Sequence, residues 1–207
     1  MKGKYIVITG DLKESRKISK RKKIQEKLKI VLDKINNKYR KNIKVKFSIT
    51  LGDEFQGLID FLALSYIIIK DIKRLLFPLK ISFGVGVGKI STKFSKRTSE
   101  MDGEAFFRSR KALGHAKNLK QNIYYITGDK NRDEFINTII MLIEAIRRDW
   151  KEIHWRRVWR YEELGTFEKV AKQEGVSKQM ISKMFNEIKY DEVKKAEEIL
   201  EKFLSTI

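Results

Sequence analysis

The order in which strand and helix patterns follow one another constrains this chain more than any other feature of its sequence. Runs of β-branched or alternating apolar residues predict strands over residues 5–9, 81–90 and 123–127, and a β-hairpin over residues 45–59. Apolar residues at helical spacing predict helices over residues 17–39, 62–76 and 105–117. The order β-α-β-β-α-β, followed by α-β, is that of a ferredoxin-like or palm domain with an extension.

The pattern changes after residue 128, where the strand signals end. Residues 131–207 carry only helical periodicity. We therefore predict an α+β protein with two domains. Residues 1–128 form the ferredoxin-like, nucleotide-cyclase-like palm domain, and residues 129–207 form an all-α domain.

Residues 166–188 have the spacing of a helix-turn-helix and resemble the sigma-region-4 and transcription-factor type. Thr166 is placed to cap the first helix, Gly175 to end it with a positive φ, and Ser177 to cap the second helix. The alternative is a purely structural three-helix unit or a protein-interaction module. In a DNA-binding unit the second helix would present polar side chains to phosphates and base edges. The candidate DNA-binding residues are Ser177, Lys178, Gln179, Ser182, Lys183 and Asn186.

The chain is strongly basic, with 46 Lys and Arg residues against 27 Asp and Glu residues and a net charge of +19. Such a charge favours a polyanionic partner, because contacts to phosphates release bound counterions. The alternative is a Lys-rich composition without functional meaning. A helix-turn-helix in a basic chain makes duplex DNA the expected partner.

Composition also excludes several classes of site and location. There is no cysteine, which excludes disulfides, thiolate zinc sites and thiol nucleophiles. Two histidines, His115 and His154, are too few for a histidine metal cage. No segment resembles a signal peptide or reaches the length of a membrane span, so we expect a cytoplasmic protein without a membrane partner.

Two acidic positions are the candidate metal ligands. Asp11 follows the first strand and Asp53 lies at the tip of the hairpin, and the strand order places these two strands side by side. Converging carboxylates suit Mg²⁺, which prefers hard oxygen ligands and keeps waters for a phosphate substrate. Glu54 is either a third ligand or points away. The alternative is ordinary solvated turn charge.

Alternating glycines are the other unusual feature of the first domain. Gly84, Gly86 and Gly88 leave one face of their strand without side chains. Either another backbone or a ligand must therefore approach that face closely.

The motifs around these positions resemble those of the SatD family. The resemblance spans about the first 128 residues and rests on a combination of short segments. They are residues 8–11 (ITGD), Ser15, residues 50–58 (TLGDEFQGL), residues 83–88 (FGVGVG), Asp102-Gly103 and residues 108–112 (RSRKA).

The same residues resemble, more distantly, the palm domains of class III nucleotide cyclases and diguanylate cyclases. Residues 52–55 are similar to the GGDEF hairpin, with Leu51 in place of its first glycine. The resemblance implies that Asp11 is a metal carboxylate and that a nucleotide binds with Mg²⁺. The cyclases' substrate-orienting asparagine has no counterpart in residues 105–107, which argues against ring closure. The implied nucleotide contacts are Gly10, Gly52, Arg108 and Arg110.

Three functions remain open at this point. The favoured hypothesis is a DNA-binding regulator whose palm domain binds a nucleotide and Mg²⁺. The second is a Mg²⁺-dependent nucleotidyl transferase, cyclase-like or nucleotide-hydrolysing enzyme that the helical domain directs to nucleic acid. The third is a scaffold that forms a homodimer, because residues 136–146 are apolar beyond a single stripe.

Overall fold

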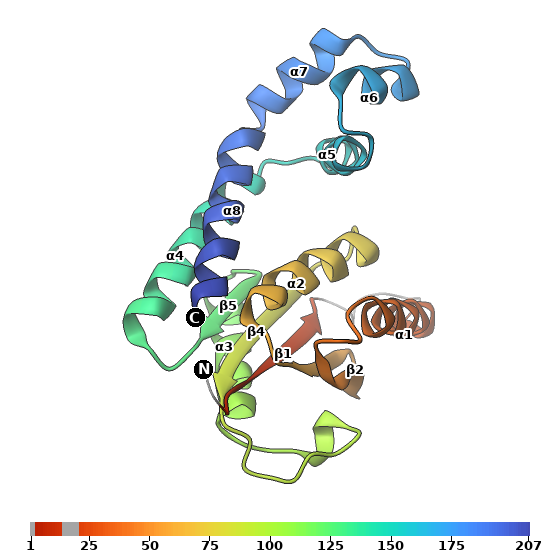
Figure 1. Cartoon of the computed structure of the whole chain (residues 1–207). Helices are drawn as coiled ribbons and strands as arrows, with labels where there is room; N and C mark the ends of the chain where they lie inside the picture. The colour runs from red at the N-terminus through yellow and green to blue at the C-terminus, as the bar shows by residue number, and fades with distance from the viewer. Residues whose placement is uncertain (1–2, 14–20) are drawn as a thin grey trace. The chain divides into compact units, whose positions relative to one another are not determined.

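The computed structural model describes residues 3–13 and 21–207, which form two compact units (Figure 1). The sheet unit comprises Met1–Ile140 and Glu201–Ile207, and the helical unit comprises Met141–Leu200. Ser15 and the first four residues of the predicted helix over residues 17–39 lie outside the described residues.

The sheet unit contains a five-stranded sheet in the order β2-β3-β1-β4-β5. The strands β1, β2, β3 and β4 pair antiparallel, while β5 runs parallel to β4. This order and these directions are those of the ferredoxin-like fold with one added strand, which confirms the predicted fold class. The strands are β1 (Tyr5–Leu12), β2 (Ile43–Leu51), β3 (Glu54–Ile59), β4 (Ile81–Gly88) and β5 (Ile123–Ile126).

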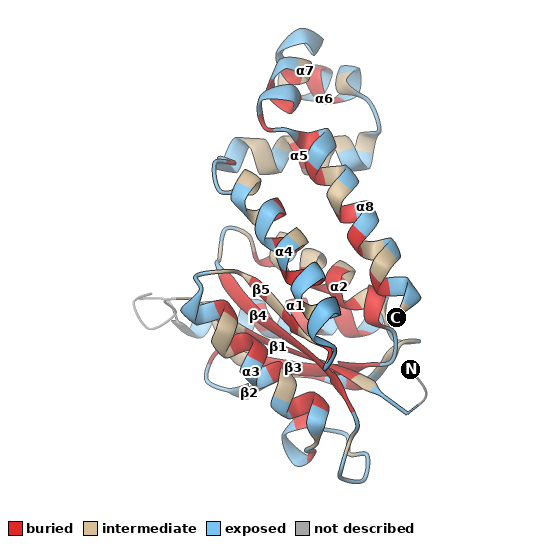
Figure 2. Ribbon diagram, turned by 90° about the vertical axis from the view of Figure 1, so that its left-hand side faces the viewer, coloured by how far each residue is buried: buried red, intermediate tan, exposed pale blue. Residues whose placement is uncertain are grey.

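Helices cover both faces of this sheet. The helices α1 (Arg21–Lys38) and α2 (Leu62–Leu76) lie on one face and α3 (Glu104–Asn118) lies on the other (Figure 2). All eight residues of β4 are buried, as expected for a strand with helices on both sides. A short 3₁₀ helix, η2 (Thr98–Glu100), lies in the connection between β4 and α3.

The glycines of β4 admit the backbone of α3, which decides between the two alternatives for this strand. A Cβ on Gly86 would lie 2.2 Å from the Ser109 nitrogen and 2.3 Å from the Ala105 oxygen. A Cβ on Gly84 would lie 2.2 Å from the Leu113 nitrogen. The bare face of the strand therefore serves close packing of a helix on the sheet, not the approach of a ligand.

The helical unit contains α5 (Glu152–Leu164), α6 (Phe167–Glu174) and α7 (Lys178–Glu187). The helices α4 (Lys130–Arg147) and α8 (Tyr190–Thr206) each contribute residues to both units. The predicted domain boundary after residue 128 lies between β5 and α4, whereas the compact units divide within α4 and α8.

Local signals in the helical unit act as the sequence predicts. The Thr166 and Ser177 side chains accept hydrogen bonds from the backbone N–H groups of Lys169 and Met180, and Gly175 has a φ of 65°. These contacts fix the ends of α6 and the start of α7.

Aromatic rings form the interior of this unit. Tyr161 packs against Phe167, Phe185 and Tyr190 with ring centroids 4.8–5.7 Å apart. Trp150 is buried and donates its Nε1 hydrogen to the Ile188 carbonyl at 2.9 Å. The unit is therefore held by apolar packing between its helices.

Two further observations concern helix surfaces. Within the described residues, no helix combines the length and the apolar character that crossing a membrane requires. The helix α4 buries Ile136, Ile140 and Ile143 but leaves Met141 and Leu142 about half exposed.

Candidate functional site

Asp11 and Glu54 lie directly opposite each other where β1 ends and β3 begins. Residues that are opposed across an antiparallel pair point to the same face of the sheet. The Oδ2 atom of Asp11 lies 2.5 Å from Nζ of Lys117, at the end of α3, and the Thr50 hydroxyl donates to Oε1 of Glu54 at 3.3 Å. The cross-strand partner of Asp11 is therefore Glu54, and a lysine lies beside the pair.

Asp53 has a different environment from this pair. It lies in the turn between β2 and β3, is only 6% exposed, and accepts a hydrogen bond from Nε2 of Gln25 at 3.4 Å. Gln25 belongs to α1, whereas Lys117 belongs to α3 on the opposite face of the sheet. Asp53 contacts α1 and Asp11 contacts α3, so the carboxylate that pairs with Asp11 across the strands is Glu54 and not the predicted Asp53.

The carboxylates of Asp11 and Glu54 are the groups that fit a divalent cation. Both residues are only partly buried, and each has a second oxygen that makes no hydrogen bond to the described residues. Two carboxylates with access to water match the coordination that Mg²⁺ prefers. Among residues 3–13 and 21–207 no group of three or more His, Cys, Asp or Glu side chains is arranged to hold a metal ion, so Asp11, Asp53 and Glu54 do not form one three-carboxylate site.

A chain of buried polar side chains lies on the same face of the sheet. Nε2 of Gln56 donates to Oγ1 of Thr9 at 2.8 Å, and Thr9 exchanges a hydrogen bond with Oγ of Ser109 at 3.0 Å. Thr9 and Gln56 are each one pair along the β1–β3 ladder from Asp11 and Glu54 on that face. Fully satisfied buried networks fix side-chain positions, so this chain positions α3 against the strands that carry the carboxylates.

Two lysines reach this end of the sheet, and neither is among the site residues predicted from the sequence. Lys117 contacts Asp11, and Nζ of Lys13 donates to Oδ1 of Asn122 at 2.9 Å. Lys13 follows Asp11 by two residues, so its closeness to the site could have been predicted from the sequence. Lys117 is more than 100 residues away, and only the close packing of α3 on β4 brings it there.

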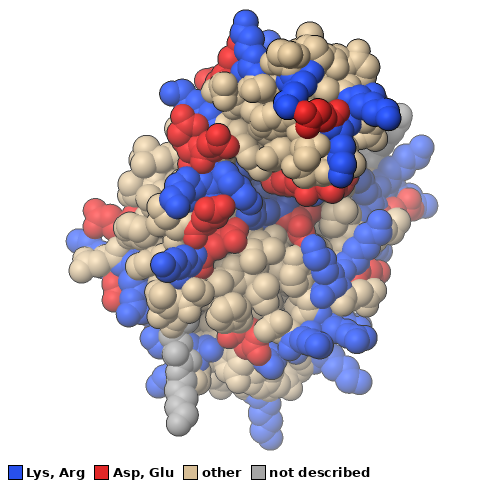
Figure 3. All heavy atoms as spheres, turned by 45° about the horizontal axis from the view of Figure 1, so that its top comes forward, with Lys and Arg blue, Asp and Glu red and all other residues tan. Residues whose placement is uncertain are grey.

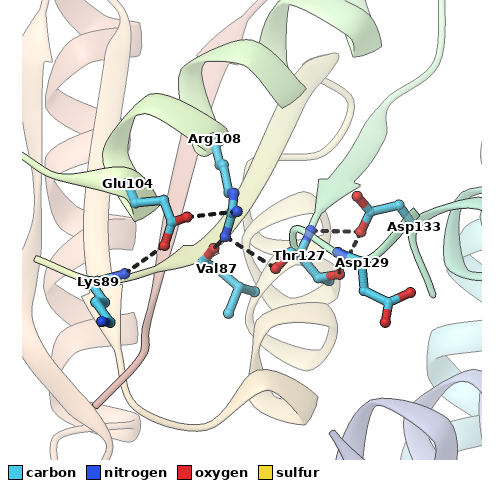
Figure 4. A network of polar contacts seen from close by, with 7 residues as sticks. All are labelled: Val87, Lys89, Glu104, Arg108, Thr127, Asp129 and Asp133. Atoms are coloured by element: carbon cyan, nitrogen blue, oxygen red, sulfur yellow. Dashed lines mark hydrogen bonds and ion pairs between the residues drawn. The ribbon is translucent and has the colours of Figure 1, made fainter. Parts of the chain in front are cut away.

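Arg108 is a structural residue in a network that Figure 4 shows. Its Nη1 atom donates to the carbonyls of Val87 and Thr127 at 2.6 and 3.3 Å, and its Nη2 atom lies 2.7 Å from Oε1 of Glu104. Thr127 in turn donates its N–H to Asp133 at 2.6 Å. The guanidinium thus joins the ends of β4 and β5 to the first turn of α3.

The position of Arg108 also separates it from the carboxylates. Val87 pairs with Ile6 on β1, five residues before Asp11, which corresponds to about 17 Å along the strand. The sequence hypothesis that Arg108 and Asp11 share one nucleotide site is therefore not met, because they lie toward opposite ends of the sheet. Arg110 makes a solvent-exposed ion pair with Asp102, whose pKa is lowered by the Gly103 N–H and by this arginine.

The two candidate nucleotide-binding glycines have structural reasons for their identity. A Cβ on Gly10 would lie 2.3 Å from the ring of Phe55, so a larger residue would displace that ring. Gly52 has a φ of 60° in the hairpin turn, and its carbonyl accepts from Nε2 of Gln25 at 3.2 Å. Neither position requires a bound nucleotide to explain its glycine.

The candidate DNA-binding residues of α7 lie on its outer side. Ser177, Lys178, Gln179, Lys183 and Asn186 are exposed and Ser182 is half-buried. Lys178 makes an ion pair with Glu168 at 2.5 Å, and the hydrogen bond from this lysine lowers the pKa of Glu168.

The charge of the helical unit does not match that of the whole chain. It contains 13 Lys and Arg residues against 12 Asp and Glu residues, a net charge of +1. The basic character of the chain is therefore not a property of the predicted DNA-binding unit.

Comparison with known proteins identifies one family. The SatD family model matches residues 5–198. No curated protein matches the chain.

Solved structures of nucleotide cyclases are weakly similar in fold. The diguanylate cyclase SiaD from Pseudomonas aeruginosa, in complex with its activator SiaC, has a TM-score of 0.46 and 12% identity over 61% of this chain and 50% of its own. The present chain therefore matches half the length of that cyclase. A bacterial light-regulated adenylyl cyclase has a TM-score of 0.45 and 15% identity over 59% of this chain and 74% of its own. The guanylate cyclase domain of RhGC from Catenaria anguillulae, in complex with GTP, has a TM-score of 0.44 and 15% identity over 54% of this chain and 72% of its own.

Proposed function

The chain belongs to the SatD family, and we propose that its sheet unit binds a nucleoside triphosphate together with a divalent cation at the paired carboxylates of Asp11 and Glu54. The observation that carries this proposal is the register of β1 and β3, which places the two carboxylates opposite each other beside Lys117. A carboxylate pair and a lysine together offer one position for a cation and one for phosphate.

Asp11 and Glu54 would hold Mg²⁺, and Lys117 would bind the phosphates. Bound Mg²⁺ supplies Lewis-acid polarisation of a phosphoryl oxygen and neutralises developing negative charge. Lys117 neutralises Asp11 in the metal-free protein. When the cation takes over that role, the lysine is released to the phosphates, so the cation and the triphosphate bind cooperatively.

The reaction class that fits is Mg²⁺-dependent chemistry at the phosphates of a nucleotide, either hydrolysis or nucleotidyl transfer. The site is supported by the hydrogen bonds that join Gln56 to Thr9 and Thr9 to Ser109. These bonds hold α3, and with it Lys117, in position. Ring closure is not proposed, because residues 105–107 are Ala, Phe and Phe and offer no amide to orient a ribose.

The test combines ligand binding with product analysis. Thermal unfolding of the full chain would be measured with each of the four ribonucleoside triphosphates, with and without Mg²⁺, and products would be separated by ion-exchange chromatography. We expect at least one nucleotide to raise the Tm only when Mg²⁺ is present. The effect should disappear in Asp11→Asn and Glu54→Gln and persist in Asp60→Asn, which makes the same charge change at an exposed residue. A shift that survives in the first two variants would exclude this site.

A second candidate function is contact of α7 with duplex DNA. It is supported by the exposed polar side chains of α7 and by the capped ends of α6 and α7. The test is fluorescence anisotropy on duplex DNA with the variant Lys178→Glu/Lys183→Glu. Affinity that is lost in this variant supports the regulator hypothesis, and unchanged affinity contradicts it.

A further inference from the structure

The positive charge of the protein is concentrated in the sheet unit. That unit contains 33 Lys and Arg residues against 15 Asp and Glu residues, a net charge of +18, whereas the helical unit has a net charge of +1. Within the sheet unit, residues 21–46 alone contain 11 basic and two acidic residues. This segment comprises α1, the following turn and the first part of β2.

Ten of these basic side chains are exposed, and most of the ten form no ion pair to the residues that the structure describes. Within the described part of the chain, only Lys38 and Lys44 of this group form ion pairs, with Asp71 and Asp60. Figure 3 shows Lys and Arg side chains gathered on its right-hand flank, the side on which α1 lies in Figure 1. The exposed basic residues are Lys22, Lys23, Lys27, Lys29, Lys34, Lys38, Arg40, Lys41, Lys44 and Lys46.

One ridge of α1 leads from these lysines to the edge of the sheet. Lys22, Lys29 and Asn36 follow one another at intervals of seven residues and therefore lie along one side of the helix. Asn36 bonds to both backbone groups of Phe47 on β2, the edge strand of the sheet. The cationic ridge thus ends at the outer edge of β2.

A pocket of about 460 Å³ lies at that edge, lined by α1, β2 and residues 96–99. Three cationic side chains line it, Lys46, Lys96 and Arg97, and none of them forms an ion pair within the described residues. Ser48 and Ser99 add hydroxyl groups, and Asp33 is the one carboxylate in the lining. Cations from two separate segments, together with hydroxyl donors, are the groups that bind phosphate oxygens.

We propose that the ridge of Lys22 and Lys29 and this edge pocket together bind the phosphodiester backbone of a polynucleotide. A mononucleotide would occupy the pocket alone and leave the lysines of α1 without a role, whereas a polymer engages both. A flat anionic surface would not reach the groups inside a pocket. The site lies on the sheet unit and does not involve α7.

The experiment measures anisotropy of fluorescein-labelled 20-nucleotide single-stranded DNA, single-stranded RNA and a 20-base-pair duplex with the full chain at 50 and 200 mM KCl. The key variant is Lys29→Glu/Lys46→Glu/Arg97→Glu. The control variant, Lys80→Glu/Lys111→Glu/Lys130→Glu, makes the same net charge change at exposed residues of the same unit outside the ridge and pocket. Circular dichroism checks that both variants are folded.

We expect the key variant to weaken binding at least tenfold at 50 mM KCl and the control to weaken it less than threefold. The slope of log K against log salt should fall by about two units, because each lost phosphate contact removes about 0.7–0.9. The three probes identify which polynucleotide binds best. An equal loss of affinity in both variants would show that binding depends only on net charge and would overturn the proposal. So would the absence of binding at 50 mM KCl, or complete competition by 1 mM inorganic phosphate. Asp11→Asn should leave this binding unchanged, which separates the proposal from the nucleotide site.

Discussion

Asn36 and Phe47 close one edge of the sheet through a pair of hydrogen bonds. Oδ1 of Asn36 accepts from the Phe47 N–H at 2.8 Å, and its Nδ2 donates to the Phe47 carbonyl at 2.9 Å. At the opposite edge Asn137 of α4 does the same for Tyr125 of β5, at 2.8 and 2.9 Å. Unpaired edge strands are sites of aggregation, so each asparagine both satisfies buried backbone groups and blocks addition of a further strand.

Replacing Asn36 by Ala should therefore destabilise the protein and expose its edge. Two buried backbone groups would lose their partners, which costs about 1–3 kcal/mol for each unsatisfied group. Urea unfolding measures this loss, and light scattering measures aggregation. The neighbouring Asn37 is exposed, so Asn37→Ala should change the free energy of unfolding by less than about 0.5 kcal/mol. Equal stability of the two variants would contradict the role of Asn36.

Replacement by alanine should change the free energy of unfolding in opposite directions at two glycines, Gly86 and Gly114. Gly86→Ala places a methyl group within 2.3 Å of the backbone of α3 and forces helix and strand apart, which we expect to cost about 3 kcal/mol or more. Gly114 lies within α3 with nothing within 4 Å of its Cβ position. Gly114→Ala should stabilise the helix by up to about 1 kcal/mol. Thermal or urea unfolding of both variants checks the close approach of α3 to β4.

Lys117→Met should separate cation binding from nucleotide binding. Removing the lysine leaves Asp11 without its ion-pair partner, so a divalent cation alone should bind more tightly. The triphosphate should bind more weakly, because a phosphate contact is lost. Isothermal titration with Mn²⁺ and with a nucleotide in Mg²⁺ measures the two effects. A parallel loss of both affinities would contradict the proposed exchange of Lys117 between Asp11 and phosphate.

Glu174 of the helical unit forms ion pairs with two arginines. Its carboxylate is 8% exposed and lies 2.6 Å from Nε of Arg157 and 2.5 Å from Nη1 of Arg160. Glu174→Gln leaves the largely buried Arg157 without a counter-ion, which we expect to cost about 3 kcal/mol. Glu168→Gln removes an exposed pair with Lys178 and should cost less than about 1 kcal/mol. Unfolding followed by tryptophan fluorescence compares them, since all three tryptophans lie in this unit.

Local features of the fold were predictable from the sequence because their causes are local. The helix α2 has the predicted bounds, and Thr166, Gly175 and Ser177 take the predicted capping positions. The strand order followed from the order of these patterns, since the ferredoxin-like arrangement is the one that β-α-β-β-α-β connections favour.

The candidate site depended on distances across the sheet, which no local pattern contains. A shift of one residue in the β1–β3 register would place Asp53 instead of Glu54 opposite Asp11. The side chain of Glu54 would then point to the other face of the sheet. Lys117 and Arg108 lie on the same helix, nine residues apart, and the packing of α3 decides that the first reaches Asp11 and the second does not.

The sequence by itself determined the elements, their order and the total charge, because periodicity, capping and composition are properties of neighbouring residues or of sums over the chain. Only the tertiary structure decided which carboxylates share a face, which cation stands beside them, and that the charge belongs to the sheet unit. The physical reason is that register and helix packing join residues far apart in the chain, and a displacement of one residue in either changes every contact at the site.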